Sequence, residues 1–409
     1  GSKIKEVKMS GIVIIGAGQA AGQAAASLRQ GKYEGSITIL GNETQPPYQR
    51  PPLSKQYLSG ELGMDRVMVR PEKFYADQDI ALHTGTSVES IDRAAKSVTT
   101  SSSDSYEYDK LLIATGSRPR ILTIPGSDLS GIHYLRTIDD VDGIREAMKT
   151  AKKICIVGGG YIGLEVTAVA VTAGLQVTVL EMEDRILKRV TTPEMSEYYH
   201  QLHAGRGADI KVSTGVSGFQ GESHVSTVLC GDEQIDADLV IVGIGIIPNI
   251  ELAEAAGLNC NNGITVDDHC RTSDPDIYAA GDCTNHPNPT MGRRLRLESV
   301  PNAMEQARVS VTNMLGGDKV YASIPWFWSD QYDLKLQMLG FSADGDTSVL
   351  RGDKAANQFA VFYLKDGKVV SVDAVNSPKE FMVCKQLYGK TVDPSVLKDT
   401  NVELKTLLN

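Results

Sequence analysis

Cysteine is scarce in this 409-residue chain, and its six cysteines stand singly, with no Cys-x-x-Cys pair among them. This spacing argues against a disulfide scaffold, and also against a zinc site or an iron–sulfur cluster held by the chain itself. We therefore predict no metal site, and we expect each thiol to be a small core side chain. The six are Cys155, Cys230, Cys260, Cys270, Cys283 and Cys384.

Long apolar runs and excess positive charge are also lacking. No run of 18 apolar residues is present, so no membrane span is predicted. The net charge is −10 and the pI about 5.3, which makes duplex nucleic acid an unexpected partner. Residues 1–10 carry no apolar stretch of the kind that a secretory signal needs. We expect a soluble cytoplasmic protein of two or three domains.

Glycine, in contrast, is abundant, and its clusters form a near-repeat about 142 residues apart. Residues 11–22 and 153–165 each read as a short apolar strand, a glycine turn and a helix of small residues. A second strand follows each unit, at residues 36–40 and 176–181. Strand–helix–strand units of this kind predict an α/β protein with two Rossmann-like dinucleotide-binding domains.

The first glycine turn is Gly16-x-Gly18-x-x-Ala21. Its first glycine permits a tight turn, its second lets a pyrophosphate approach the backbone, and Ala21 lets the helix pack closely on the strand. A plain strand–helix joint is the alternative. The next strand ends at Leu40 with no carboxylate, so Glu43 is the nearest candidate for a ribose ligand.

The second turn, Gly158-x-Gly160-x-x-Gly163, is a more complete match. The strand after it ends at Glu181, 23 residues beyond Gly158, where a carboxylate accepts hydrogen bonds from adenosine ribose hydroxyls and repels a 2′-phosphate. This arrangement favours NADH over NADPH. Two alternatives remain open: Glu181 is a solvated surface residue, or Arg185 reaches a 2′-phosphate.

The remaining pattern divides the chain into three domains. A first dinucleotide domain is built from residues 9–118 and 247–322, and a second is inserted between them at 119–246. From residue 323 to 409 alternating apolar residues predict a smaller α+β domain with an antiparallel sheet and a late helix.

Three further segments carry a resemblance to a known family. Ile113-Ala-Thr-Gly-Ser-Arg-Pro119, residues 242–249 and residues 272–282 resemble the shared signatures of FAD-dependent pyridine nucleotide reductases. The resemblance covers nearly the whole chain. It implies that the first glycine turn holds FAD and the second the nicotinamide nucleotide, with Asp282 bonding the ribityl chain.

The segment Tyr48-Gln-Arg-Pro-Pro-Leu-Ser-Lys55 indicates the subfamily. Disulfide reductases carry a redox cysteine pair in this neighbourhood, whereas here no cysteine precedes Cys155. With residues 296–303 and 325–331, the segment resembles the NADH–ferredoxin reductases of bacterial oxygenase systems. The resemblance implies hydride transfer from NADH to FAD N5 and then single-electron transfer to a two-iron ferredoxin. A rubredoxin or nitrite-reductase-type reductase, or a redox-responsive flavoprotein like apoptosis-inducing factor, is the alternative.

The same resemblance implies roles for single residues. Lys55 lies beside the isoalloxazine N5 edge and pairs with Glu165, Tyr161 covers the flavin, and Trp328 lies near the flavin or the nicotinamide. The alternatives are ordinary surface charges for the first two and packed core aromatics for the others. The expected FAD contacts are Gly16, Gly18, Ala21, Glu43, Arg50, Lys55, Ala114, Thr115, Gly116, Arg118, Asp282 and Val300. The expected NAD contacts are Gly158, Gly160, Tyr161, Ile162, Gly163, Glu181 and Gly245.

A partner surface is the last prediction. Ferredoxins are usually acidic and this chain is acidic too, so any complementary patch must be local. Arg293, Arg294, Arg308 and Lys335 are the candidates, and solvated charges without a partner are the alternative of equal weight.

Overall fold

The computed structural model describes residues 11–409 and divides into two compact units. Expectations for residues 1–10, including the start of the first predicted domain, lie outside the described residues. The first unit contains the chain up to Gln49 with Gly63–Arg118 and Ile247–Pro325. The second contains Arg50–Leu62, Pro119–Ile246 and Trp326–Asn409. No helix of the described part is long and apolar enough to cross a membrane.

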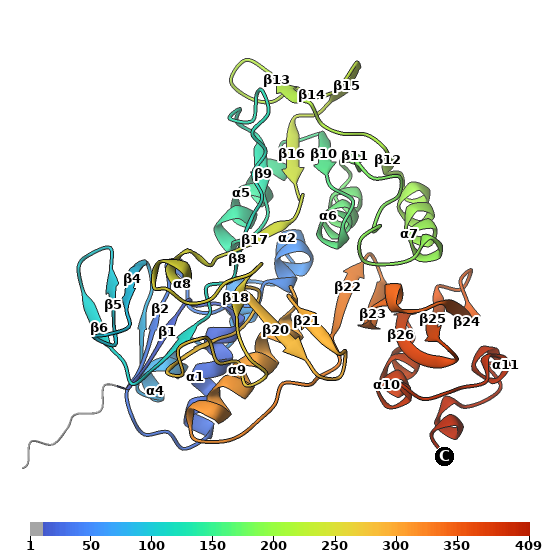
Figure 1. Cartoon of the computed structure of the whole chain (residues 1–409). Helices are drawn as coiled ribbons and strands as arrows, with labels where there is room; N and C mark the ends of the chain where they lie inside the picture. The colour runs from blue at the N-terminus through green and yellow to red at the C-terminus, as the bar shows by residue number, and fades with distance from the viewer. Residues whose placement is uncertain (1–10) are drawn as a thin grey trace, which may run out of the picture. The chain divides into compact units, whose positions relative to one another are not determined.

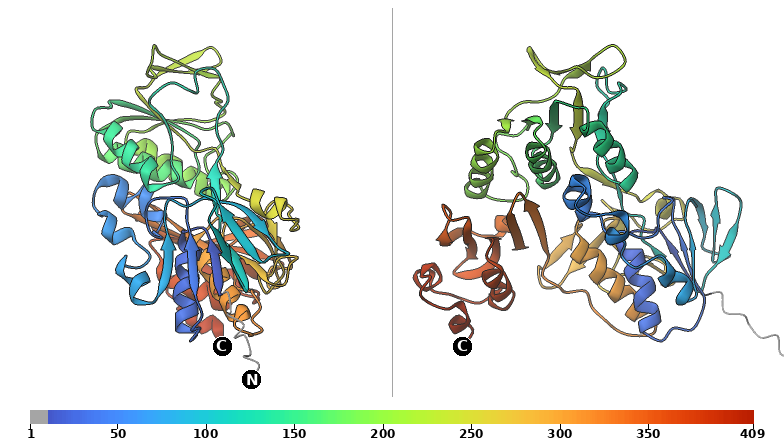
Figure 2. Two further views of the ribbon diagram at one scale, coloured as in Figure 1. Left: turned by 90° about the vertical axis from the view of Figure 1, so that its left-hand side faces the viewer. Right: turned by 180° about the vertical axis from the view of Figure 1, so that it is seen from behind.

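A five-stranded parallel sheet forms the centre of the first unit, because its strands are apolar on both faces. Its order is β19 (Ile277–Ala279), β7 (Lys110–Ile113), β1 (Ile12–Ile15), β2 (Ile37–Leu40) and β3 (Ile80–His83). Helices α1 (Gln19–Gln30) and α9 (Val300–Met314) lie side by side and pack on one face (Figure 1; Figure 2, right). The alanines of α1 allow this close approach.

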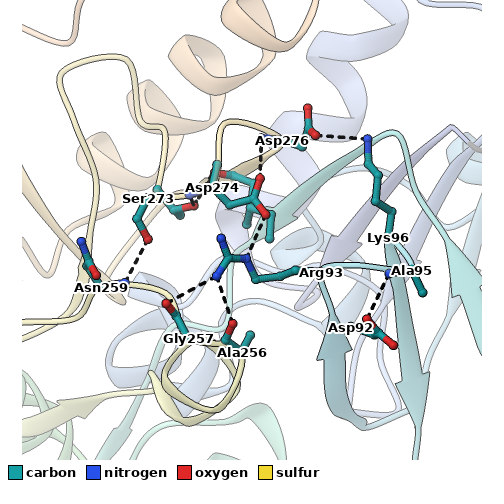
Figure 3. Close-up of polar contacts among 12 residues, drawn as sticks. Asp92, Arg93, Ala95, Lys96, Ala256, Gly257, Asn259, Ser273, Asp274 and Asp276 are labelled. Atoms are coloured by element: carbon teal, nitrogen blue, oxygen red, sulfur yellow. Dashed lines mark hydrogen bonds and ion pairs between the residues drawn. The ribbon is translucent and has the colours of Figure 1, made fainter.

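The opposite face of this sheet carries a three-stranded antiparallel sheet and a short helix. These are β4 (Val88–Asp92), β5 (Ser97–Thr100), β6 (Ser105–Glu107) and α8 (Glu251–Ala255). Figure 3 shows how Arg93, just after β4, fastens this layer. Its guanidinium pairs with Asp274 at 3.0 Å and donates to the Gly257 carbonyl beyond the end of α8 at 3.5 Å. Lys96 and Asp276 form a second ion pair at 3.2 Å, so the loop before β19 is held from two sides.

Smaller elements complete the first unit. A three-stranded sheet combines β18 (Ile264–Thr265), β20 (Thr284–Asn288) and β21 (Arg293–Leu295). The short helices are α3 (Met64–Val67) and α4 (Lys73–Asp77). The chain leaves this unit within β8 (Ser117–Pro119) and returns within β17 (Ile246–Pro248).

The second unit contains the other predicted Rossmann-like sheet. Its five parallel strands are ordered β12 (Asp209–Lys211), β11 (Gln176–Leu180), β10 (Lys153–Val157), β16 (Leu239–Val242) and β9 (Ile132–Tyr134). The helices are α2 (Gln56–Ser59), α5 (Ile138–Met148), α6 (Tyr161–Thr172) and α7 (Pro193–Gly205), with the 3-10 turn η1 (Pro51–Ser54). An antiparallel sheet of β13 (Gly218–Gln220), β14 (Thr227–Cys230) and β15 (Glu233–Asp236) packs on the face that carries Cys155 and Val240.

The C-terminal part of the second unit is an antiparallel sheet with helices, so the predicted fold class is confirmed. Its order is β22 (Trp326–Gln331), β23 (Leu334–Gly340), β26 (Lys368–Val375), β25 (Gln358–Lys365) and β24 (Thr347–Asp353). Helices α10 (Pro378–Leu387) and α11 (Pro394–Lys398) and the 3-10 turns η2 (Ser342–Asp344) and η3 (Leu404–Leu408) complete it. Leu336, Met338, Phe359 and Val361 form one apolar cluster with Tyr199 of α7, which joins this sheet to the Rossmann-like part.

Candidate functional site

The first glycine turn joins β1 to α1 and has the geometry that a pyrophosphate requires. Gly16 has φ 108°, and a Cβ there would lie 2.0 Å from the Ala114 carbonyl oxygen. A Cβ on Gly18 would meet no atom within 4 Å, so the flank of this residue is open to a ligand. Ala21 is fully buried. These three positions fit a bound dinucleotide phosphate at the N-terminus of a 12-residue helix.

The second turn, between β10 and α6, repeats this geometry. Gly158 has φ 112°, and a Cβ would lie 2.0 Å from the carbonyl oxygen of Gly243. Gly160 faces open space, whereas a Cβ on Gly163 would lie 2.2 Å from the carbonyl oxygen of Gly158. Gly158 therefore permits the turn, Gly160 allows a ligand to approach, and Gly163 allows the helix to pack closely.

Glu181 lies directly after β11 and points back to this turn. Its Oε2 accepts a hydrogen bond of 2.8 Å from the Gly159 amide, which fixes the carboxylate at the edge of the turn. The Arg185 guanidinium is held elsewhere, since it donates to the Thr191 carbonyl at 3.0 Å and to Ser196 Oγ at 2.6 Å. The geometry favours a ribose without a 2′-phosphate, because the nearby cation is already engaged.

Two more expected NAD contacts lie in the second unit. Gly245 has φ 103°, and its carbonyl accepts from the Arg120 amide at 3.0 Å. Ile162, at the start of α6, is 49% exposed. An apolar side chain this exposed beside a glycine turn is suited to contact a ligand.

The segment after β7 is locked to the segment before α8. Thr115 Oγ1 donates to the Asn249 carbonyl at 2.7 Å, and Asn249 Nδ2 donates to the Thr115 carbonyl at 2.9 Å. Arg118 donates to Asn249 Oδ1 and pairs with Glu251, both at 2.7 Å. Gly116 between them has φ 64°, a conformation that favours glycine.

In the first unit, Asp282 lies between β19 and β20, and Val300 lies at the start of α9. Asp282 is half-buried and accepts from Ser117 Oγ at 3.1 Å, while Val300 is the first residue of α9. Gln306 Oε1 accepts from the Gly281 amide at 2.8 Å. Its Nε2 is buried and has no hydrogen-bond partner among the described residues, so both of its N–H groups remain available to a bound group. These polar groups fit the expected FAD site.

Glu43 and Arg50 lie in different units. Glu43 lies three residues beyond the end of β2. It accepts a hydrogen bond from the hydroxyl of buried Tyr48. Arg50 precedes η1 in the second unit and donates to the Arg136 carbonyl at 2.7 Å.

Lys55 and Glu165 form a buried ion pair within the second unit. Lys55 Nζ lies 3.1 Å from Glu165 Oε1, and the two side chains are 9% and 4% exposed. The Pro51 carbonyl also accepts from Lys55 at 2.9 Å. Two hydroxyls, Ser54 Oγ and Ser329 Oγ, donate to the Glu165 oxygens at 2.6 Å each. Burial raises the pKa of Glu165, and Lys55 and the two serines oppose that rise.

Tyr161 and Trp328 are in contact with other aromatic residues. Tyr161 donates to Met338 Sδ at 2.9 Å and meets the Phe327 ring edge-on at 5.4 Å. Trp328 lies 5.6 Å from Trp326, ring centre to ring centre. These contacts match the packed-core alternative for Tyr161, and the flavin contact of both residues stays a prediction.

Sequence reasoning missed the two serines that bind Glu165. Both lie inside segments that resemble the family, 48–55 and 325–331, so the signal was present at segment level. Nothing in the sequence indicated that Gln331 would be completely buried in contact with Ser329, or that His203 would be completely buried in contact with Gln331.

All six cysteines are free, and burial raises the pKa of each thiol. For Cys283 the pKa rises to about 11 and for Cys384 to about 12. None of these thiols has the depressed pKa of a redox-active cysteine.

Two glycine turns with dinucleotide geometry, a carboxylate fixed beside the second turn and a buried Lys–Glu pair are typical of an oxidoreductase that uses two nucleotides. The chain belongs to the pyridine nucleotide-disulphide oxidoreductase family, whose model matches residues 10–307, and a reductase C-terminal domain matches residues 326–408. FAD and NADH are the cofactors.

Similar proteins agree with this assignment. A 5,5'-dehydrodivanillate O-demethylase ferredoxin reductase subunit of Sphingobium sp. is 43% identical over 401 residues, 97% of each chain. Putidaredoxin reductase of Pseudomonas putida is 42% identical over 406 residues, 97% of this chain and 96% of that one. A solved structure of a ferredoxin reductase from Rhodopseudomonas palustris has a TM-score of 0.95 at 40% identity and covers 98% of this chain and 100% of that chain.

Proposed function

We propose that this protein is an NADH:ferredoxin oxidoreductase that supplies electrons to an oxygenase through a two-iron ferredoxin. Similarity to two ferredoxin reductases over 97% of the chain supports the reaction class. We further propose a cytoplasmic location, which suits a protein with six free thiols.

The observation that carries the proposal is the place of Lys55. In a family named for disulphide chemistry, no cysteine precedes Cys155, and the segment 48–55 instead supplies a buried lysine. Because this segment offers no thiol to accept electrons, we propose that they leave to an external carrier.

The residues of the chain bind and orient. Bound FAD supplies a ring that takes a hydride from NADH and releases electrons one at a time. The two glycine turns hold the phosphates, and Glu181 selects a ribose with free hydroxyls. Lys55, held by Glu165, would place its ammonium group beside the flavin ring, where negative charge develops on reduction.

The test is an anaerobic stopped-flow experiment on the purified holoprotein. Flavin bleaching is followed with NADH and with NADPH, and the reduced protein is then mixed with a two-iron ferredoxin or with rubredoxin. Fast bleaching by NADH and fast reoxidation by the ferredoxin are expected. Faster reoxidation by rubredoxin would replace the proposed acceptor, and slow bleaching with a long-lived charge-transfer band would support a signalling flavoprotein.

We also propose that Arg293, Arg294, Arg308 and Lys335 take part in docking an acidic ferredoxin. All four are exposed. The Arg294 guanidinium donates to the Val266 carbonyl at 2.7 Å and to the Asn285 carbonyl at 2.8 Å, so its charge is held in place. Held charges lose little entropy on binding, which suits a recognition surface.

Charge reversal at Arg293 tests this docking role. We expect Arg293→Glu to raise the KM for ferredoxin severalfold and Arg293→Gln to raise it less, with the difference shrinking as salt is added. Reduction of a small dye by NADH serves as the control and should not change. An equal loss with dye and with ferredoxin would contradict the docking role.

A further inference from the structure

A row of buried polar side chains runs from α7 to Glu165. His203 comes from α7, and Gln331 and Ser329 come from one face of β22. All three are 0% exposed. His203 Nε2 lies 2.7 Å from Gln331 Oε1, Gln331 Nε2 lies 3.1 Å from Ser329 Oγ, and Ser329 Oγ lies 2.6 Å from Glu165 Oε2. At the outer end, the hydroxyl of half-buried Tyr332 lies 3.3 Å from His203 Nδ1.

The chemistry of each group fixes the direction of these hydrogen bonds. An ionised Glu165 only accepts, so Ser329 donates its single proton there and its oxygen accepts from the amide nitrogen of Gln331. The amide oxygen then faces His203, whose Nε2 must carry hydrogen. His203 is neutral, because burial lowers its pKa to about 4, and its Nδ1 accepts from Tyr332. Every donor in the row points toward Glu165.

The inner end of the row is the Lys55–Glu165 pair. The other titratable groups that face Glu165 are Tyr161 and Tyr199, and burial holds the pKa of both well above the usual range, so both are neutral. Lys55 is therefore the positive charge that faces this carboxylate among the described residues. Because a buried carboxylate is costly, each donor that reaches it favours its ionised form.

We propose that His203, Gln331 and Ser329 are positioning residues that keep Glu165 ionised and thereby hold Lys55 in place for the flavin. The proposal rests on the proposed function, because only a flavin reductase uses Lys55 in this way.

His203 acts through the orientation of the Gln331 amide. While His203 donates to Oε1, the amide must present its nitrogen to Ser329. Without that donor the amide is free to turn, and its oxygen then competes with Glu165 for the single proton of Ser329. A residue three hydrogen bonds from Glu165 thus decides whether the carboxylate keeps its second serine donor.

Three disruptive variants of the holoprotein and one conservative variant test this row. Ser329→Ala removes the last donor, and Gln331→Glu replaces the donating nitrogen by an acceptor of the same shape. His203→Met removes the directing donor, whereas His203→Gln keeps a donor near the Nε2 position and should restore the wild-type behaviour. The matched control is Tyr199→Phe on the same helix, which removes a buried hydroxyl that has no hydrogen-bond partner among the described residues.

The first measurement is the rate of flavin reduction by NADH as a function of pH. A rise of one unit in the pKa of Glu165 lowers the ionised fraction tenfold on the acid side. We expect Ser329→Ala, Gln331→Glu and His203→Met to lose about tenfold in rate on the acid limb, with less than about twofold change well above the pKa. Tyr199→Phe and His203→Gln should follow the wild type.

The second measurement is independent of turnover. The infrared carbonyl band of protonated Glu165, identified by its absence in Glu165→Gln, is titrated with pH in the protein with and without flavin. The band should appear at higher pH in the three disruptive variants. If Ser329→Ala and Gln331→Glu leave both the acid limb and the band unchanged, the row does not position Glu165, even if His203→Met fails to fold. Loss of NADH-driven bleaching in the wild type would instead contradict the proposed function.

Discussion

Asp373 is a carboxyl group buried in the second unit without a cation. It lies on β26 and is 3% exposed, and no ion pair of the described residues includes it. Thr191 Oγ1 and the Tyr363 hydroxyl donate to its Oδ2 at 2.6 and 2.9 Å. Burial raises its pKa from the usual 3.8 to about 6, and the two hydroxyls only partly oppose that rise.

This pKa fixes the sign of a stability change with pH. The folded state disfavours the ionised form of Asp373, so the stability associated with this group is present below the unfolded pKa and is lost as the pH rises through about 6. Each unit of pKa difference corresponds to about 1.4 kcal/mol, so the loss is about 3 kcal/mol above neutral pH. Asp373→Asn removes this titration while its carbonyl oxygen still accepts from Thr191 and Tyr363.

We therefore expect the stabilisation of the second unit by Asp373→Asn to be larger at pH 8 than at pH 4 by about 2 kcal/mol, because part of the wild-type loss has already occurred at pH 4. Urea unfolding followed by tryptophan fluorescence measures it, because both tryptophans, Trp326 and Trp328, belong to that unit. The control is Asp333→Asn, an 82% exposed carboxylate of the same unit, for which the difference should stay near zero. An equal effect of Asp373→Asn at both pH values would refute the reasoning.

Two further predictions concern the second glycine turn. Glu181→Ala should lower kcat/KM for NADH and raise it for NADPH, each by about tenfold to a hundredfold, because one negative charge and its ribose hydrogen bonds are lost. Steady-state kinetics with both nucleotides measures this. An unchanged ratio of the kcat/KM values for NADH and NADPH would contradict it. Gly158→Ala should prevent stable folding, because its Cβ would lie 2.0 Å from the carbonyl oxygen of Gly243 at φ 112°, whereas Gly160→Ala should fold normally and weaken NADH binding. Thermal unfolding and nucleotide titration separate the two, and equal stability of both variants would count against the assigned roles.

The two Rossmann-like sheets were predictable because their strands and glycine turns are local patterns. Gly158 and Glu181 are 23 residues apart, and a strand–helix–strand unit brings such positions together by itself. Lys55 and Glu165 were paired only through the family resemblance, because 110 residues separate them.

The polar row behind Glu165 was not predictable for the same reason. His203 and Gln331 are separated by 128 residues. Gln331 ends the segment 325–331, but His203 belongs to no motif. Their contact depends on the packing of α7 against the C-terminal sheet, which the sequence expresses only as apolar periodicity. Arg185 is a similar case, because only the structure shows that its guanidinium is already engaged.

The raised pKa values of the six thiols affect how readily the cysteines are oxidised. A reduced flavoprotein that meets dioxygen generates peroxide, and peroxide attacks thiolates far faster than thiols. Because burial keeps every cysteine in its thiol form at neutral pH, the protein contains few thiolates that peroxide can oxidise. A flavoprotein of this family therefore exposes few reactive thiolates to any peroxide formed at its flavin.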